Sequence, residues 1–286
     1  MPERDGYIPG VPCWVDTTQP DPEAAARFYE ALFGWELQDM MPPEAPGHYF
    51  VARQRGLDVA AISSPPPGSA PGATWNTYIW VERADDAAKR VRDAGGAVLA
   101  EPFDVMEAGR MATFADPGGA VFSVWEPKDH IGARLVNEPV SLNFNALHTP
   151  DAEAAKRFYG EVFGWGTLHL PGGGETWTLP GYGDHLEERT PGLRKMVAEL
   201  GGPAGFEDVV ASIIPIADDG SLPRWSVQFS VADVDATAAR ARELGGSVVT
   251  PPFDAPWARL TVVADPQGAA LTAAQFVPEN KDVELE

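Results

Sequence analysis

The sequence predicts an α+β fold made of two tandem copies of one module. Two observations predict it in this chain of 286 residues. Short motifs recur in the same order in both halves of the chain, and each recurrence contains a helical pattern followed by short apolar segments. The pattern also restarts within each copy, so each module is expected to contain a pair of β-α-β-β-β units.

The repeat begins with a helix motif. Residues 21–29 recur as 151–159, and Phe33-Gly34-Trp35 recurs as Phe163-Gly164-Trp165. Later landmarks keep the same order: Trp75, Gly95-Gly96, Pro102-Phe103-Asp104, Arg110 and Asp116-Pro117 recur as Trp225, Gly245-Gly246, Pro252-Phe253-Asp254, Arg259 and Asp265-Pro266. We therefore expect a first module at 8–127, a linker at 128–139 and a second module at 140–277.

The first helix of the first copy has clear start and stop signals. Asp21 is a good N-cap, Pro22 suits the first helical position, and Gly34 suits the end. Strands are expected at 12–18, 35–38, 48–53, 59–63, 75–81, near 98, 111–115 and 121–125, with a second helix at 85–94. The second copy has an insertion at 181–208, in which an amphipathic helix over 186–200 is expected to cap that module.

Composition restricts the class of protein. The formal charge of −21 and the scattered Lys and Arg residues argue against nucleic acid and anionic membranes as partners. The single cysteine, Cys13, excludes an internal disulfide, and no secretory signal or membrane span is evident. We expect a soluble cytoplasmic protein, monomeric or homodimeric, whose partner is a small molecule.

The paired units resemble the vicinal oxygen chelate superfamily, the group of glyoxalases, bleomycin-resistance proteins and extradiol dioxygenases. The residues that carry the resemblance are the Phe-Tyr…Phe-Gly-Trp helix and the closing Arg…Asp-Pro-x-Gly segment of each copy. More narrowly, the chain resembles actinobacterial two-module members labelled glyoxalase or hydroxylase. The resemblance implies a curved mixed sheet around a cavity in each module, where the enzymes hold a divalent metal with His, Glu or Gln from four strands.

The positions equivalent to those metal ligands have other residue types in this sequence. They are Trp14, Asn76 and Ser123 in the first copy, Phe144, Ser226 and Thr272 in the second, and a loosely aligned fourth position near 60–62 and 211–213. Indole and phenyl rings cannot ligate a divalent metal, and neutral amides and hydroxyls bind weakly. The sequence therefore predicts no metal site and no cofactor.

Strand alternation indicates what would line the cavities instead. In the first module these residues are Trp14, Asp16, Asn76, Tyr78, Trp80 and Trp125; in the second they are Phe144, Ser226, Gln228, Ser230 and Thr272, with Trp177 and Trp225 nearby. This composition suits a planar aromatic or hydrophobic ligand held by a few hydrogen bonds. The alternative is that the aromatics simply fill each module as core. Arg110 is a candidate partner for Asp16.

Three functions remain open at this stage. The leading hypothesis is a metal-independent protein that binds an aromatic or hydrophobic small molecule and sequesters an antibiotic or metabolite. The alternative is a glyoxalase-like lyase or a metal-free cyclase or isomerase that uses Asp16 or His185; His185 lies in the insertion and the other histidines are interpreted as surface or loop residues. The third is an interaction scaffold.

Overall fold

The computed structural model describes residues 3–66, 68, 72–170, 174–217 and 221–283. The first module forms one eight-stranded mixed sheet in the order β2-β3-β4-β1-β5-β8-β7-β6. Its strands are β1 (Pro12–Thr18), β2 (Glu36–Asp39), β3 (Tyr49–Gln54), β4 (Leu57–Ser63), β5 (Thr74–Trp80), β6 (Ala97–Val105), β7 (Gly109–Ala115) and β8 (Val121–Pro127). The β1–β4 and β5–β8 pairs are parallel, whereas β1 and β5 join the two half-units in antiparallel register.

The second module repeats this topology in a sheet of order β10-β11-β12-β9-β13-β16-β15-β14. Its strands are β9 (Leu142–Thr149), β10 (Gly166–His169), β11 (Glu175–Thr178), β12 (Val209–Pro215), β13 (Arg224–Ser230), β14 (Ser247–Ala255), β15 (Ala258–Ala264) and β16 (Ala270–Phe276). The predicted α+β class and the paired β-α-β-β-β units are confirmed, and neither sheet closes into a barrel.

The repeated helices begin and end where their signals predict. Helix α1 (Pro22–Phe33) is capped by Asp21, whose side chain accepts from the Ala24 amide at 2.9 Å. Gly34 ends it in the left-handed conformation at φ 71°, which a glycine adopts without the Cβ penalty. Helix α3 (Ala152–Phe163) ends the same way, and the later helices of the two modules are α2 (Ala84–Asp93) and α6 (Val234–Glu243).

The insertion differs from its prediction. It forms two short helices, α4 (Tyr182–Arg189) and α5 (Leu193–Glu199), followed by a 3-10 turn at Phe206–Asp208. The single helix expected over 186–200 is wrong because Pro191 cannot donate its backbone nitrogen and Gly192 takes φ 90°. Neither α5 nor the turn has a fully buried residue; on the expected apolar face Leu193 and Val197 are half-buried, and Met196 and Leu200 are exposed.

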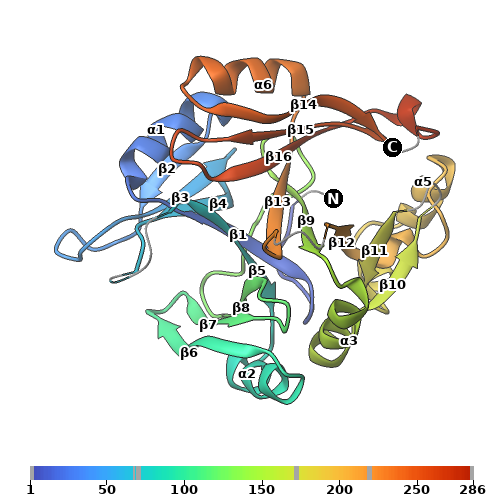
Figure 1. The fold of residues 1–286 in the computed structure, drawn as a ribbon, viewed down its shortest axis with the longest axis horizontal. Coiled ribbons are helices and arrows are strands. Elements are labelled where there is room, and N and C mark those ends of the chain that lie inside the picture. The colour runs from blue at the N-terminus through green and yellow to red at the C-terminus, as the bar shows by residue number, and fades with distance from the viewer. Residues whose placement is uncertain (1–2, 67, 69–71, 171–173, 218–220, 284–286) are drawn as a thin grey trace.

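The two hydrophobic cores each combine parts of both modules. One core joins β1, α1 and β4 of the first module to β13, α6 and β16 of the second; the other joins β5, α2 and β8 of the first to β9, α3 and β12 of the second. Accordingly α1 lies beside α6 and α2 beside α3 (Figure 1). We call the sheet face that the helices cover the helix face, and the opposite one, which bears Trp14, Asp16, Tyr78 and Trp125 in the first module, the inner face.

Reciprocal hydrogen bonds join the modules across these cores. The Tyr29 hydroxyl donates to Asp265 at 2.9 Å, and the Tyr159 hydroxyl donates to Asp116 at 3.1 Å. The two Phe-Gly-Trp tryptophans behave alike: the Trp35 indole donates to the Val140 carbonyl at 2.8 Å, and the Trp165 indole to the Gly10 carbonyl at 2.9 Å. The repeated motifs are therefore contacts between modules.

The repeated Gly-Gly pairs have the same explanation. A Cβ on Gly96 would lie 2.8 Å from the ring of Phe158, and a Cβ on Gly246 would lie 3.1 Å from the ring of Phe28. Each of these rings belongs to the first helix of the other module. The second glycine of each pair thus allows the two modules to approach closely.

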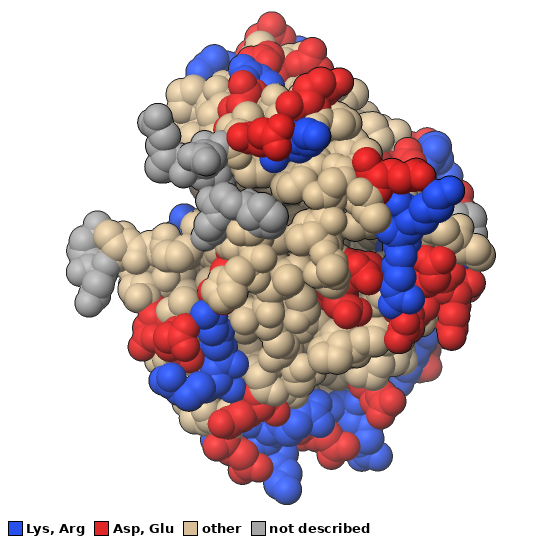
Figure 2. Space-filling model, turned by 90° about the vertical axis from the view of Figure 1, so that its right-hand side faces the viewer, with Lys and Arg blue, Asp and Glu red and all other residues tan. Residues whose placement is uncertain are grey.

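Charge is unevenly placed on the surface. On the face that bears α5 and the ends of the C-terminal strands, uncharged residues cover the centre and charged side chains lie mainly around its edge (Figure 2). The exposed apolar residues of these elements include Met196, Leu200 and Phe276. No helix within the described part of the chain is long and apolar enough to cross a membrane.

The hydrogen bonds between the modules predict that two tyrosine variants lose stability to different extents. In Tyr159→Phe, Asp116 loses a donor and the Trp225 indole, which donates to the Tyr159 hydroxyl at 2.8 Å, loses its acceptor. We expect the free energy of unfolding to fall by about 2 kcal/mol. In Tyr29→Phe, Asp265 keeps its 2.6 Å bond from Gln19, so we expect a loss of about 1 kcal/mol. Urea denaturation followed by tryptophan fluorescence measures both, and wild-type midpoints for the two variants would contradict the assignment.

Candidate functional site

The inner face of the first module is filled with aromatic side chains around one carboxyl group. Trp14 pairs with Tyr78, and Asp16 pairs with Asn76, across the β1–β5 junction. Trp14, Tyr78 and Trp125 are all buried, and Asp16 is only 3% exposed. The interpretation that the aromatics form core therefore holds for this module.

Asp16 is held by hydrogen bonds from three neighbours. It accepts from the Asn76 amide at 2.8 Å, the Tyr78 hydroxyl at 2.8 Å and the Tyr49 hydroxyl at 3.4 Å. The Trp14 indole in turn donates to the Tyr49 hydroxyl at 3.0 Å. Burial raises the pKa of Asp16, and the three donors oppose that rise. The carboxyl is thus satisfied by protein groups.

The linker closes one end of this inner face. The ring of His130 meets Trp14 edge-on at 4.5 Å between centroids and Trp125 at 5.7 Å. The Trp125 indole also donates to the His130 carbonyl at 2.7 Å. Burial lowers the pKa of His130. His130 lies in a loop, as predicted, but its ring packs inside the first module, which no local signal indicated.

The second module has smaller side chains at the equivalent positions. Asp16, Tyr78, Trp80 and Trp125 of the first module correspond to Ala146, Gln228, Ser230 and Ala274 of the second, by the spacing of the repeat and the equal strand registers. Phe144, Ala146, Ser226, Gln228, Ser230 and Thr272 are all partly exposed. The inner face of the second module is therefore open where that of the first is filled.

A cavity of about 260 Å³ lies at one mouth of this open face, and we call it the second-module cavity. It is lined by Ala73, Thr74, Trp75, His148, Arg224, Trp225, Ser226, Val262, Gly268, Ala270, Leu271 and Thr272. His148 Nε2 lies 2.9 Å from the Ser226 hydroxyl. Burial, with a smaller effect of Arg224, lowers the pKa of His148 to about 4, so this imidazole is neutral at pH 7.

Comparison with known proteins identifies the family. The model of the Glyoxalase/Bleomycin resistance protein/Dioxygenase superfamily matches residues 14–124 and again 141–272. The chain belongs to this superfamily.

Two of its relatives are similar along nearly their whole length. CFP32 of Mycobacterium bovis, which bears the name of a glyoxylase, is 37% identical over 98% of this chain and 100% of that protein. The anthracycline biosynthesis protein DnrV of Streptomyces peucetius is 35% identical over 94% of each chain. The Mn(II)-bound glyoxalase from Novosphingobium aromaticivorans shares the fold, with a TM-score of 0.60 at 16% identity over 94% of this chain and 83% of that one.

The superfamily's metal does not fit the residues at the equivalent positions here. Trp14 and Ser123 are buried on the inner face of the first module, and Ser123 bonds to the Thr113 hydroxyl at 3.0 Å. In the second module the corresponding side chains are Phe144, Ser226 and Thr272. Among the described residues, no three His, Cys, Asp or Glu side chains gather where they could hold an ion. The donors present are hydroxyls and an amide, which bind divalent metals weakly.

Several predicted site residues lie elsewhere. Trp177 is fully buried on the helix face, 5.4 Å from the Tyr159 ring, so it does not reach the inner face. Trp225 lines the second-module cavity, although its ring packs against Tyr159 in the core. Trp80 is on the inner face of the first module and half-buried. Cys13 is fully buried in one of the two shared cores.

Two electrostatic expectations are also corrected. Arg110 is not the partner of Asp16: it pairs with Asp85 at 3.0 Å and Asp104 at 3.4 Å, because its strand phase directs it toward the start of α2. His185 is on α4, stacked on Tyr182 at 6.5 Å between ring centroids, and is not among the residues that line the second-module cavity. The insertion that holds it contacts the rest of the chain through Arg189 with Asp5 and Leu200 with Trp257.

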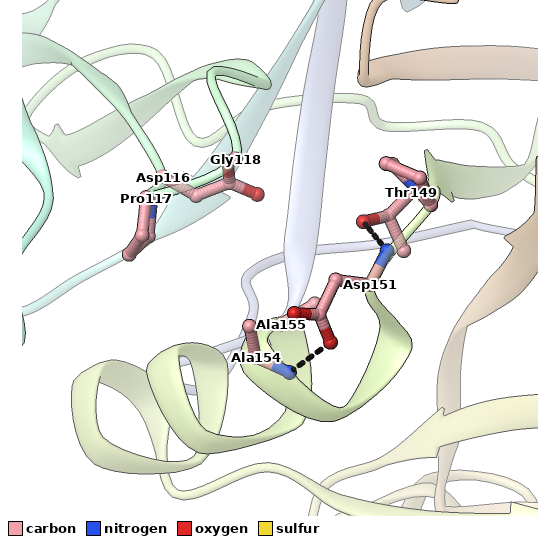
Figure 3. Close-up of a pocket in the computed structure, with 8 residues that line it drawn as sticks. Asp116, Pro117, Gly118, Thr149, Asp151, Ala154 and Ala155 are labelled. Atoms are coloured by element: carbon pink, nitrogen blue, oxygen red, sulfur yellow. Dashed lines mark hydrogen bonds between the residues drawn. The ribbon is translucent and has the colours of Figure 1, made fainter. Parts of the chain in front are cut away.

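A smaller hollow of about 120 Å³ lies between the modules, at Asp116–Gly118 and the start of α3 (Figure 3). The equivalent place at the start of α1 is spanned by Gln267, whose amide accepts from Asp21 N at 2.7 Å and donates to Asp21 O at 2.8 Å. Gly118 occupies the position of Gln267. This hollow is therefore a packing difference between the copies, and we assign it no ligand.

The packing difference predicts that a glutamine stabilises the first module. A Cβ on Gly118 would meet Asp116 at 3.2 Å and Pro223 at 3.7 Å, so a side chain fits with a small adjustment. We expect Gly118→Gln to raise the free energy of unfolding by about 0.5–1 kcal/mol, and Gln267→Gly to lower it by about 1–2 kcal/mol. Thermal and urea unfolding measure both. A loss of stability in Gly118→Gln would show that the hollow cannot accept a side chain.

The buried carboxyl predicts a pH-dependent effect. Because the folded pKa of Asp16 is raised, its favourable contribution is complete below about pH 4 and is lost as pH rises through the folded pKa. Asp16→Asn keeps a polar group without the charge, so its stability relative to wild type should increase from pH 4 to pH 7. Asp16→Ala should lose about 1–3 kcal/mol at pH 4, since Asn76 and Tyr78 lose their acceptor, and less at pH 7, where the wild type has lost part of the contribution of Asp16. Denaturation at the two pH values checks this; a pH-independent difference for Asp16→Asn would contradict it.

Proposed function

We propose that this protein binds a small planar aromatic ligand in the second-module cavity, without a metal ion, and that it sequesters an antibiotic or metabolite in this way. The single observation that supports this most strongly is the loss of bulk on the second inner face. Beside Ser226 and Thr272, which line the cavity, the second module has Ala146 and Gln228, with Ser230 and Ala274 further along the same face. At the four equivalent positions the first module has a hydrogen-bonded carboxyl, a tyrosine and two tryptophans. The first module then acts as a filled structural partner.

The lining supports a ligand with flat apolar faces. Trp75, Trp225 and Leu271 line the cavity although they are almost fully buried, and Val262 and Ala270 are its more exposed apolar residues. Polar atoms are few: His148, Ser226, Thr272 and Arg224 lie around the same cavity. Small-molecule sites commonly combine a mainly apolar wall with a few polar groups that fix the orientation of the ligand.

The relatives support the ligand class. DnrV and the similar DauV of a Streptomyces strain are named for anthracycline biosynthesis, and anthracyclines are polycyclic aromatic compounds. Metal independence rests on the chemistry of the residues at the family's ligand positions, where no imidazole or carboxylate is present. CFP32 bears the name of a glyoxylase. Metal-dependent turnover is therefore the competing function, and a chelator would abolish it without affecting metal-independent binding.

The observations favour binding over the lyase, cyclase or isomerase alternative. That alternative needs Asp16 or His185 next to a substrate. Asp16 is 3% exposed and already accepts three hydrogen bonds, and His185 lies outside the lining of the second-module cavity. Neither Asp16 nor His185 is therefore placed to act as an acid or base on a ligand in the cavity.

A matched pair of variants tests the proposal. Ala270 lines the second-module cavity, and Val121 is its exposed equivalent in the first module. We expect the wild type to bind anthraquinone-2-carboxamide with a dissociation constant of about 1–100 μM in calorimetry, with or without a chelator. Ala270→Phe should weaken binding at least about tenfold because the added ring occupies the cavity, whereas Val121→Phe should bind as the wild type does.

The same experiment can refute the proposal in two ways. If neither this compound nor other polycyclic aromatic probes bind, or if Ala270→Phe binds unchanged, the second-module cavity is not the ligand site. If chelation abolishes binding and a divalent metal restores it, metal independence is wrong.

A further inference from the structure

The second-module cavity has an uneven distribution of ionisable groups. Of the residues that line it, only Arg224 and His148 are ionisable, and no aspartate or glutamate is among them. The two lie directly opposite each other on β13 and β9. In a chain with a formal charge of −21, a cavity mouth whose described lining has an arginine and no carboxylate is a local exception.

Both residues are specific to the second module. The equivalent positions in the first module are Thr74 and Thr18, which pair with each other in the same register. The side chains at this mouth therefore differ in charge between the copies, just as those deeper on the inner face differ in size. One inner face is both open and positively charged at its mouth.

Arg224 is also unlike the strand arginines that serve the fold. Arg110 and Arg259 occupy equivalent positions and each pairs with two aspartates, Asp85 and Asp104 or Asp235 and Asp254. Arg224 is exposed and forms no ion pair with any of the described residues. Its guanidinium remains available to a ligand at the cavity that it lines.

His148 adds a neutral polar group beside this charge. Its Nε2 is 2.9 Å from the Ser226 hydroxyl, and it is uncharged at pH 7 because burial lowers its pKa to about 4. Arg224 is then the one full positive charge among the lining residues, while His148, Ser226 and Thr272 offer neutral hydrogen bonds.

We infer that the second-module cavity selects an aromatic ligand with an anionic oxygen group, a carboxylate or an ionised phenol, which Arg224 binds at the mouth while the rings lie against the apolar wall. This inference rests on the proposed function and adds the charge of the ligand to it. An arginine suits the task because its planar guanidinium gives two parallel N–H donors to one carboxylate. Arg224 lies at the rim of the cavity and stays hydrated, so its charge has a low desolvation cost when no ligand is bound.

The test compares one ring system in two charge states. Anthraquinone-2-carboxylate and anthraquinone-2-carboxamide differ only in the charged group, and calorimetry at pH 7 in low salt measures both. We expect the wild type to bind the carboxylate about tenfold more tightly than the carboxamide. Arg224→Gln should abolish this preference, so that the two compounds bind with similar affinity, whereas Arg224→Lys should keep part of it.

Controls separate a local contact from net charge. Arg27 is exposed on α1, forms no ion pair with any described residue and does not line the cavity, so Arg27→Gln removes the same charge elsewhere. This variant should keep the full preference. Added salt should reduce the preference in the wild type, since the mouth is open to solvent.

Each outcome decides between the two proposals. Equal affinity of the wild type for both compounds, or a preference that survives in Arg224→Gln, overturns the inference and leaves the proposed function standing. Loss of the preference in Arg27→Gln to the same extent also overturns it, because net charge would then explain the effect. Binding of neither compound overturns the proposed function and the inference together.

Discussion

The burial of each module's first helix against the other module is the constraint on which the structure depends. Tyr29 and Tyr159 lie in these interfaces, and each donates its hydroxyl to the Asp-Pro aspartate of the opposite module. A buried phenol or carboxylate without such a partner would cost several times what a satisfied bond contributes. Neither module has a complete hydrophobic core of its own, so neither motif can change unless its partner in the other copy also changes.

This division explains why the repeated landmarks lie on the helix faces while the bulk of the inner faces differs. The helix faces keep their tyrosines, tryptophans and close-packed glycines because each of them contacts the other module. The inner faces supply none of the hydrogen bonds between modules described above, and their residues differ in size between the copies. In the first module Trp14, Trp125 and His130 of the linker fill the space, whereas the second has smaller side chains and a cavity.

The sequence could predict what depends on local pattern. The strand positions, the Asp21 cap, the Gly34 stop and the duplication all follow from spacing and residue type, and all are found in the structure. The errors concern which neighbours a side chain meets. Trp177 and Arg110 lie on strands with apolar or mixed residues on both faces, so alternation alone did not identify the inner one. Nothing local marks His130 as the residue that enters the first module, because its partners lie on β1 and β8.

The two modules also show where a charged or polar group has a low desolvation cost. Asp16 is inside a filled module, and its carboxyl is accommodated by donors from Asn76, Tyr78 and Tyr49, at the expense of a raised pKa. Arg224 is at a rim, where water solvates it and no described carboxylate is required to balance it. In the proposed function, the second-module cavity orients its ligand without a metal ion. A hydrated charge at the mouth does this without the desolvation that an interior charge requires, and that is why the rim of the second module is the place to look for its specificity.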